Sequence, residues 1–428
     1  MNYVNTENWK YTMQTIKKLL FILVLYPVFT YGQDTSVLRL DTILKRIDEQ
    51  NEQLKSYSLK AEGFQYSAKA ATSWMAPMVG VGTFMTPYPG QEIMSDSDKG
   101  SLMLQFEQDI PNPSKLRGKR DFIASQGRSE LESRKVKLNE LYAQAKMLYY
   151  SWLIAEKRIN ILRENVVLIK TMKEIEGIRY EYNRSSLGSV FKADARIEDT
   201  ENMIRMQEGE IAKARAWLNS LMNQPGNTLF AVDTTFFPVF TPQASLDTSI
   251  LATRRKDITK MDADIESMRL NIQSMKKESK PDFKIRFDHM SPLGKMMPNA
   301  YSIMGMVSIP IAPWSSKMYK NEVKAMELNV QAMQKERTGM LVESQGMLYG
   351  MQYEIQNMQK QISAIEEKVI PSLNRALDAN FQAYQENKQE ITVVINDWEA
   401  VTMMRNSLLD EKLKLYKMIV DYEKELYK

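Results

Sequence analysis

The chain has no cysteine and only one histidine among its 428 residues. The absence of cysteine excludes a disulfide framework, a thiolate metal site and a lipid-modified N-terminal cysteine. The single imidazole, His289, cannot form a histidine metal cluster, and a surface or lipid-facing position is its simplest interpretation. We therefore expect neither a metal site nor a cofactor.

Catalytic motifs are also missing. The sequence contains no nucleophile elbow, phosphate-binding loop, zinc signature or EF-hand. Paired carboxylates such as Glu366-Glu367 belong to helical charge patterns and are typical of solvated helix faces. We therefore predict that the protein is not an enzyme.

Charge of one sign and long apolar runs are scarce as well. Basic and acidic residues number 57 and 53 and leave a net charge of +4, with no basic block that could follow a phosphate backbone. Nucleic acid is therefore not an expected partner. The mean hydropathy of −0.41 is too low for a bundle of membrane helices.

The N-terminus carries a pattern typical of secretion. A basic pair, a short apolar run and small residues at the cleavage positions follow one another: Lys17-Lys18, residues 19–29, Thr30 and Gly32. The run is too short to span a bilayer as a helix, so residues 1–32 are predicted to be a leader and signal peptide, with Met13 as a second candidate start. A buried N-terminal helix is the alternative. We expect the following residues to be exported.

The remainder consists of two similar halves. Three pairs of landmarks recur in the same order at an offset of about 200 residues: Ala76-Pro77 with Lys280-Pro281, Ile110-Pro111 with Ile309-Pro310, and Tyr182 with Tyr384. The pattern predicts a duplication with a first repeat at 33–222 and a second at 251–428. Between them, residues 223–250 are rich in proline, threonine and phenylalanine and predict a non-helical linker.

Each half contains a very long amphipathic helix. In the first half, apolar residues recur at alternating three- and four-residue spacing: Leu138, Leu141, Ala145, Leu148, Trp152, Ala155, Ile159, Leu162, Val166 and Ile169. A looser seam follows in the second half: Ile391, Val394, Trp398, Val401, Leu408, Leu415, Ile419 and Tyr422. Such seams pack against neighbouring helices along their length. A helix over 121–179 would be about 90 Å long, which suits a tunnel wall or a coiled-coil rod.

Four segments beside the repeated prolines alternate with a period of two. They are predicted strands at about 79–88, 101–110, 282–290 and 301–310. One face is apolar and suits lipid, whereas the other suits a water-filled lumen. The predicted lumen residues are Glu107, Asp109, Lys284, Arg286 and Asp288. The alternative is a pair of amphipathic hairpins that cover a soluble core.

Four strands are too few to close a barrel. The smallest common membrane barrels have about eight strands, and an unpaired edge in lipid costs several kcal/mol for each unsatisfied backbone group. Closure therefore requires several chains to share one barrel: two chains would supply eight strands and three would supply twelve.

With this order of elements, the chain resembles the TolC-like outer membrane efflux proteins, the outer membrane factors of tripartite efflux and secretion systems. The resemblance covers nearly all of the mature sequence. It implies a mostly α fold with a small transmembrane β part, in which a homotrimer forms a twelve-stranded β-barrel continued by an α-helical barrel across the periplasm. It also implies outer-membrane lipid, a periplasmic adaptor (membrane fusion protein) and an inner-membrane pump as partners.

The same resemblance implies two helix-hairpin tips at the periplasmic end, near residues 185 and 387, where the adaptor would dock. The matching residues are Arg184, Ser185, Ser186, Leu187 and Gly188 in the first repeat and Glu386, Asn387, Lys388 and Gln389 in the second. Ser185 and Asn387 replace the tip glycine of the family. Acidic gate residues of the family fall here on Val393 and Asn396, which leaves Asn396 and Asp397 as a candidate polar constriction.

Methionine is unusually frequent, with 30 residues. It gathers around both predicted hairpins: Met75, Met78, Met85, Met94 and Met103, and Met290, Met296, Met297, Met304 and Met306. Thioethers bind Cu(I) and Ag(I), and the resembling family has a metal-efflux branch. The other interpretation is that methionine is a flexible filler at lipid-facing and helix-packing positions.

The leading functional prediction is a passive outer-membrane exit duct of a tripartite (RND-type) efflux or type I secretion system. The alternative is a soluble periplasmic coiled-coil scaffold or adaptor. The predicted hairpins discriminate between the two, because only the duct places them in the outer membrane.

Overall fold

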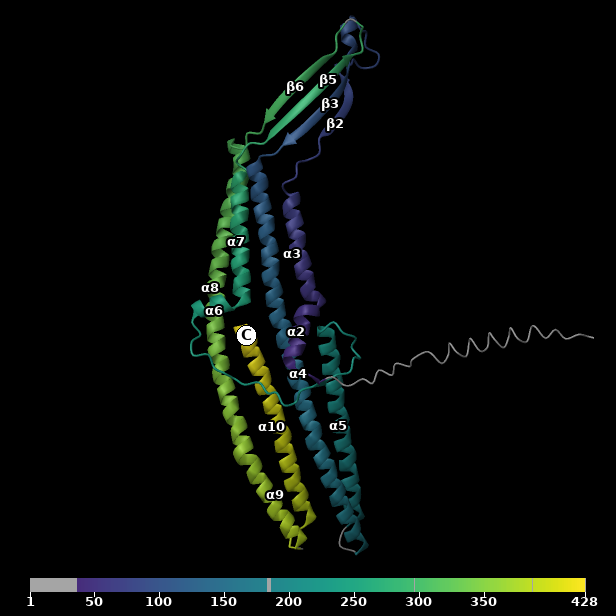
Figure 1. Ribbon diagram of the computed structural model, residues 1–428, viewed down its shortest axis with the longest axis vertical. Helices are drawn as coiled ribbons and strands as arrows, with labels where there is room; N and C mark the ends of the chain where they lie inside the picture. The colour runs from purple at the N-terminus through teal and green to yellow at the C-terminus, as the bar shows by residue number, and fades with distance from the viewer. Residues whose placement is uncertain (1–36, 183–185, 296, 387, 428) are drawn as a thin grey trace, which may run out of the picture.

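The structure is a computed structural model that describes residues 37–182, 186–295, 297–386 and 388–427. The predicted signal peptide at 1–32 and the tip residues Arg184, Ser185 and Asn387 lie outside the described residues. The molecule is a long rod with a β-sheet at one end and helices running to the other (Figure 1). Within the described part, no helix is both long and apolar enough to cross a bilayer.

The first half carries two short helices, a strand hairpin and two long helices. In chain order these are β1 (Val37–Leu38), α2 (Leu40–Gln50), α3 (Glu52–Ala70), β2 (Met78–Phe84), the 3₁₀ turn η1 (Asp96–Lys99), β3 (Ser101–Ile110), α4 (Pro113–Glu181) and α5 (Leu187–Leu221). Helix α4 is roughly 100 Å long at 1.5 Å per residue and starts before the expected residue 121. Its start is set by Asn112, whose side chain accepts from the Ser114 N–H, with Pro113 in the first turn.

The second half repeats this order. Its elements, after the short strand β4 (Ala231–Val232), are α6 (Thr248–Arg254), α7 (Lys256–Lys277), β5 (Phe283–Pro292), β6 (Ala300–Val307), α8 (Pro313–Ala364), the π-helical turn η2 (Ile365–Val369), α9 (Ile370–Gln385) and α10 (Ile391–Leu426). Pro371 lacks an N–H and would clash in a regular helix, and the π turn just before it lets the chain continue to the tip. Helix α6 begins inside the predicted non-helical linker 223–250.

The two hairpins form one antiparallel sheet with the order β2-β3-β5-β6. The central pair, β3 and β5, joins the two halves, with Glu107 opposite Arg286 and Asp109 opposite Lys284. Strands β2 and β6 are open edges. The sheet is therefore a single open layer of four strands. Each of its two outer strands has one edge whose backbone N–H and C=O groups can still pair with another strand.

Two strands are shorter than expected. Strand β2 ends at Phe84 rather than near 88, because Met85 adopts a left-handed φ of 52° that breaks the extended backbone. Close by, a Cβ on Gly100 (φ 76°) would lie 2.7 Å from Thr86, so only glycine fits there. Strand β6 ends at Val307 rather than near 310.

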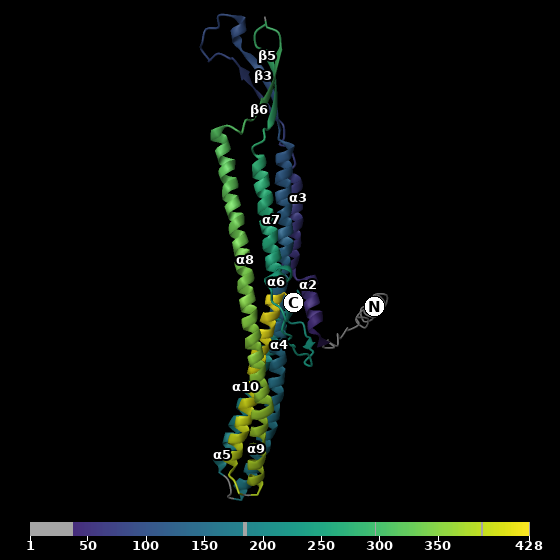
Figure 2. The same cartoon turned by 90° about the vertical axis from the view of Figure 1, so that its left-hand side faces the viewer.

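Helices α3, α4, α7 and α8 run from the sheet to the middle of the rod, and α4, α5, α9 and α10 continue to the far end (Figures 1 and 2). Helix α4 packs against α3, α5, α7 and α10. Eight of the ten residues of its predicted seam are at most 8% exposed: Leu141, Ala145, Trp152, Ala155, Ile159, Leu162, Val166 and Ile169. The other two, Leu138 and Leu148, are partly buried. Because α4 buries an apolar stripe against its neighbours along much of its length, packing between helices can stabilise the rod without a globular core.

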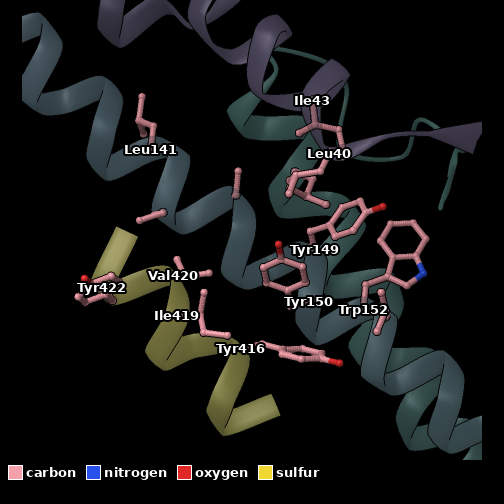
Figure 3. Packing of buried hydrophobic residues seen from close by; sticks show 14 of the residues in the cluster. Leu40, Ile43, Leu141, Tyr149, Tyr150, Trp152, Tyr416, Ile419, Val420 and Tyr422 are labelled. Carbon is pink, nitrogen blue, oxygen red and sulfur yellow. The ribbon is translucent and has the colours of Figure 1, made fainter. Parts of the chain in front are cut away.

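The largest core cluster lies at mid-height, where α2, α4 and α10 meet (Figure 3). Tyr150 of α4 packs on Tyr416 of α10 with ring centroids 5.5 Å apart. Nearby, Arg255 is nearly buried and pairs with Asp257 at 2.7 Å and with Glu425 at 2.9 Å. The Arg255 ion pairs hold the end of α10 against the α6–α7 junction within the second half. The contact between Tyr150 and Tyr416 joins the two halves at this level.

Candidate functional site

The polar face of the sheet carries the charged residues predicted to line a lumen. The register places Glu107, Asp109, Lys284, Arg286 and Asp288 on the same face. Lys284 Nζ lies 2.6 Å from Glu107 Oε1 and 3.1 Å from Asp109 Oδ1. Arg286 Nε donates to Asp288 at 2.9 Å. Opposite charges are paired, which makes this face polar but almost neutral.

The other face of the sheet is apolar and open. Its side chains come from all four strands: Val79, Val81, Leu102, Leu104, Phe106, Phe283, Ile285, Phe287, Tyr301, Ile303 and Val307. Each is between 39% and 73% exposed. His289 belongs to this face, opposite Leu104 and Tyr301. A continuous apolar surface of this size marks an interaction with lipid or protein.

The far end of the rod is formed by two helix hairpins. At the first tip, α5 starts at Leu187, and the Ser186 hydroxyl accepts from the Ser189 N–H at 3.2 Å. At the second tip, the Lys388 N–H donates to the Ala383 carbonyl at 2.9 Å, and its ammonium pairs with Glu386 at 2.6 Å. The described tip residues Ser186, Leu187, Gly188, Glu386, Lys388 and Gln389 therefore lie at one end of the molecule (Figure 1).

Tyr384 anchors the second hairpin to the first. Its ring is 2% exposed, and its hydroxyl donates to Glu176 Oε1 of α4 at 3.3 Å. The Arg179 guanidinium lies 3.9 Å from the ring centroid, a cation–π contact. Burial, with the Glu176 carboxylate as a smaller cause, raises the pKa of Tyr384 to about 12, so the hydroxyl stays a donor at physiological pH.

A groove of about 600 Å³ opens between the hairpins just above the tips. It is walled by α4, α5 and α10, with an apolar floor that includes Ile169, Met172 and Trp398. Arg196 of α5 bonds to Glu399 of α10 across the groove. An apolar floor with a charged rim suits a protein helix or another amphipathic partner.

The two residues of the predicted constriction point in different directions. Asn396 is exposed and lines the groove toward α5. Asp397 is half-buried and accepts from Asn380 of α9 at 2.5 Å. Neighbours on a helix lie about 100° apart, so the two side chains occupy different faces of α10, and their joint role in a constriction stays a prediction.

Several residues of the far end were missed by sequence reasoning. The burial of Tyr384 was not expected, because the duplication pairs it with Tyr182, and the structure buries Tyr384 but leaves Tyr182 72% exposed. Glu176 and Arg179 gave only the weak signal of charged residues at the end of a heptad seam. In the described part of the chain, no group of three or more histidine and acidic residues could hold a metal ion.

Solved structures with this fold exist, although their sequences differ widely. The CusC structure matches with a TM-score of 0.72 and 16% identity over 90% of this chain and 91% of that chain. The outer-membrane channel OprN matches at 0.70 and 14%, over 90% and 89%. The outer membrane protein VceC from Vibrio cholerae matches at 0.68 and 15%, over 90% and 95%.

No protein-family model and no curated protein sequence matches the chain. At these identities the structural matches establish the fold alone, which this chain shares with these outer-membrane proteins. They confirm the prediction of a mostly helical rod with a small β part.

Proposed function

We propose that three copies of this chain form an outer-membrane exit duct that passively conducts substrates from a periplasmic adaptor and an inner-membrane pump to the exterior. The system would be a tripartite (RND-type) efflux or type I secretion system. The observation that carries the proposal is the open four-stranded sheet with an exposed apolar face and an ion-paired polar face. The likeness in fold to outer-membrane channels supports it.

The dimensions of the sheet suit a bilayer. Strands β3 and β5 have 10 residues each, so each is roughly 34 Å long. At the tilt of about 45° common in membrane barrels, such a strand spans about 24 Å, close to the apolar band of about 25 Å. Tyr301 and Trp314, 71% and 82% exposed, flank opposite ends of the band, as an aromatic girdle requires.

The two open edges favour a shared barrel. In lipid, unpaired N–H and C=O groups on β2 and β6 would each cost several kcal/mol, and pairing β2 of one copy with β6 of the next removes them. A barrel of about eight strands is filled by its own side chains. Three copies, with twelve strands, would be the smallest assembly that leaves an aqueous pore. Their helices would continue this pore as a tube.

The tips and the groove above them would receive the adaptor. The groove lies between hairpins of the two repeats, and its rim carries charges of both signs: Lys192, Arg196, Asp199 and Glu399. A helical hairpin with apolar and charged stripes would match it. Substrate choice would then belong to the pump, since the paired charges of the sheet leave its polar face almost neutral.

The deciding experiment combines location, assembly and conductance. The duct predicts outer-membrane fractionation, an SDS-resistant species of three times the chain mass, and ion channels in planar bilayers after purification. The rival, a soluble periplasmic scaffold or adaptor, predicts release by osmotic shock and no conductance. Release by osmotic shock would overturn the proposal.

A separate test addresses the docking site. A photo-crosslinking amino acid at Lys388 should capture a periplasmic adaptor, identified by mass spectrometry as a membrane fusion protein. The matched control is Lys360, an exposed lysine of α8 away from the tips, which should capture none. Equal capture at both positions would contradict the assignment of the tips as the docking site, without contradicting the proposal that the protein is a duct.

A further inference from the structure

Every methionine within the four-stranded sheet lies on its polar face. The five residues are Met78, Met103, Met290, Met304 and Met306. The register fixes their side: Met78 is opposite Glu107, Met304 is opposite Arg286, and Met306 is opposite Lys284. Met103 and Met290 are opposite each other across the central strand pair.

The apolar face of these strands has no methionine; its positions are filled mainly by valine, leucine, isoleucine and aromatic residues. A flexible apolar filler would be expected on that face, since it suits lipid. The opposite distribution contradicts the filler interpretation for the sheet. Apolar thioethers beside paired charges on the polar face therefore need another explanation. The ability of thioether sulfur to bind metal ions provides one.

We propose that these methionines form a thioether-lined path that binds soft monovalent cations, Ag(I) and Cu(I), as cargo. The proposal rests on the proposed function, because the polar face must line the duct. Methionine sulfur is a soft, neutral ligand that selects Cu(I)-like ions over Mg²⁺ and Ca²⁺, which prefer oxygen. The absence of cysteine from the chain leaves methionine as its sulfur ligand.

The arrangement suits passage better than storage. Met103 and Met290 extend from directly opposite positions on the same face, where Cβ atoms lie about 4.5–5.5 Å apart. Gly82 and Ala300, the next positions in the same row, leave room around the pair. Met78 and Met304, both level with the Glu107–Arg286 pair, form a second level four residues from the first, or about 14 Å further along the sheet at ~3.4 Å each. Met306 lies two residues beyond this level.

Weak sites at successive levels are what conduction requires, because an ion must enter readily and also leave. Met78 and Met304 are 55% and 46% exposed in the single chain, so their side chains are accessible to a passing ion. In three copies the path would hold thioethers from every chain at each level.

The test compares two quintuple variants of the purified full-length protein in chloride-free nitrate buffer. The first replaces the sheet set by leucine: M78L, M103L, M290L, M304L and M306L. The matched control replaces five exposed helix methionines: M203L, M206L, M318L, M347L and M403L. Methionine-to-leucine changes nearly conserve volume and cost little stability, and circular dichroism melting verifies that both variants fold.

Silver(I) is the probe, measured by calorimetric titration and by silver K-edge absorption for Ag–S contacts. Wild type and the control should bind Ag(I) with sulfur ligation, and the sheet variant should lose affinity by at least about tenfold. Retention of wild-type Ag(I) binding by the sheet variant, or equal loss in the control, would overturn the proposal.

Potassium conductance in planar bilayers separates this proposal from the function on which it rests. Wild type and both variants should conduct K⁺ equally. Normal K⁺ conductance with unchanged Ag(I) binding in the sheet variant would refute the thioether path and leave the duct standing. Absence of K⁺ conductance in all three proteins would refute the duct and, with it, the path.

Discussion

The Tyr384 hydroxyl donates to Glu176 Oε1 at 3.3 Å, although the two residues are 208 positions apart in the sequence. Both residues are almost fully buried, and Arg179 covers the tyrosine ring. This contact joins α9 of the second repeat to α4 of the first just above the tips. The relative position of the two hairpins therefore depends on a few polar atoms within an otherwise apolar interface.

Substitution of Tyr384 by phenylalanine should loosen the far end of the rod. The change removes a hydrogen bond to a charged acceptor, worth about 1.5–3 kcal/mol, and keeps the ring under Arg179. We expect a lower melting temperature by circular dichroism and faster amide hydrogen exchange in α9. Tyr182→Phe is the matched control, since Tyr182 is exposed, and should change stability by less than about 0.5 kcal/mol. Equal effects of both variants would contradict the assignment.

Stability should fall at alkaline pH. Burial raises the pKa of both Tyr384 and Tyr149 to about 12, with smaller contributions from nearby carboxylates. Between pH 10 and pH 12 the unfolded chain releases protons that the folded chain keeps, so the free energy of unfolding decreases as pH rises. The loss should reach about 1.4 kcal/mol per tyrosine near pH 11.

Melting temperatures at intervals from pH 8 to pH 11 measure this dependence. The decline should be smaller in Tyr149→Phe, which removes a donor that bonds to the Asp233 carbonyl at 2.6 Å, and unchanged in Tyr182→Phe. A decline of the same size in all three proteins would show that other groups cause it.

An arginine on the apolar face of the sheet should block assembly. Ile285 is 47% exposed on that face, and Ile285→Arg should destabilise the membrane form by about 2–4 kcal/mol. The SDS-resistant oligomer should decrease in the outer membrane. Ser302→Arg, on the polar face, is the control and should assemble normally. If the apolar face were in water, Ile285→Arg would be tolerated as well.

Removal of Lys284 should change the ion selectivity of the duct. Its ammonium neutralises Glu107 and Asp109, so Lys284→Ala leaves two carboxylates facing the lumen in every copy. The reversal potential in a KCl gradient should shift toward stronger cation preference. Lys280→Ala, an exposed lysine outside the strands, should leave the reversal potential unchanged. An unchanged potential in Lys284→Ala would mean that this face does not line the conducting path.

The architecture was largely predictable, because its signals are local. The heptad seam from Leu141 to Ile169 and the alternation around Phe106 and Ile285 each depend only on the period of the side chains along one segment. The predicted ends of the helices and strands were less accurate. The left-handed φ of Met85 and the cap of α4 by Asn112 are decided by contacts within a few residues that periodicity does not register.

The candidate site was predictable in part. Five charged strand residues were expected on one face, and the structure places them there. The groove above the tips and the burial of Tyr384 were not predictable, because they arise where α4, α5, α9 and α10 meet from both halves of the chain. The duplication even suggested that Tyr182 and Tyr384 are equivalent, whereas their surroundings differ completely.

The sequence by itself determined the periods, the duplication and the charge balance, and these require long packed helices and strands that cannot close within one chain. Only the tertiary structure decided which residues meet across the two halves. The register of β3 against β5 places Met103 opposite Met290, and the packing of α9 on α4 buries Tyr384 beside Glu176. Local periodicity follows from backbone geometry, whereas contacts between distant segments depend on how whole elements pack together.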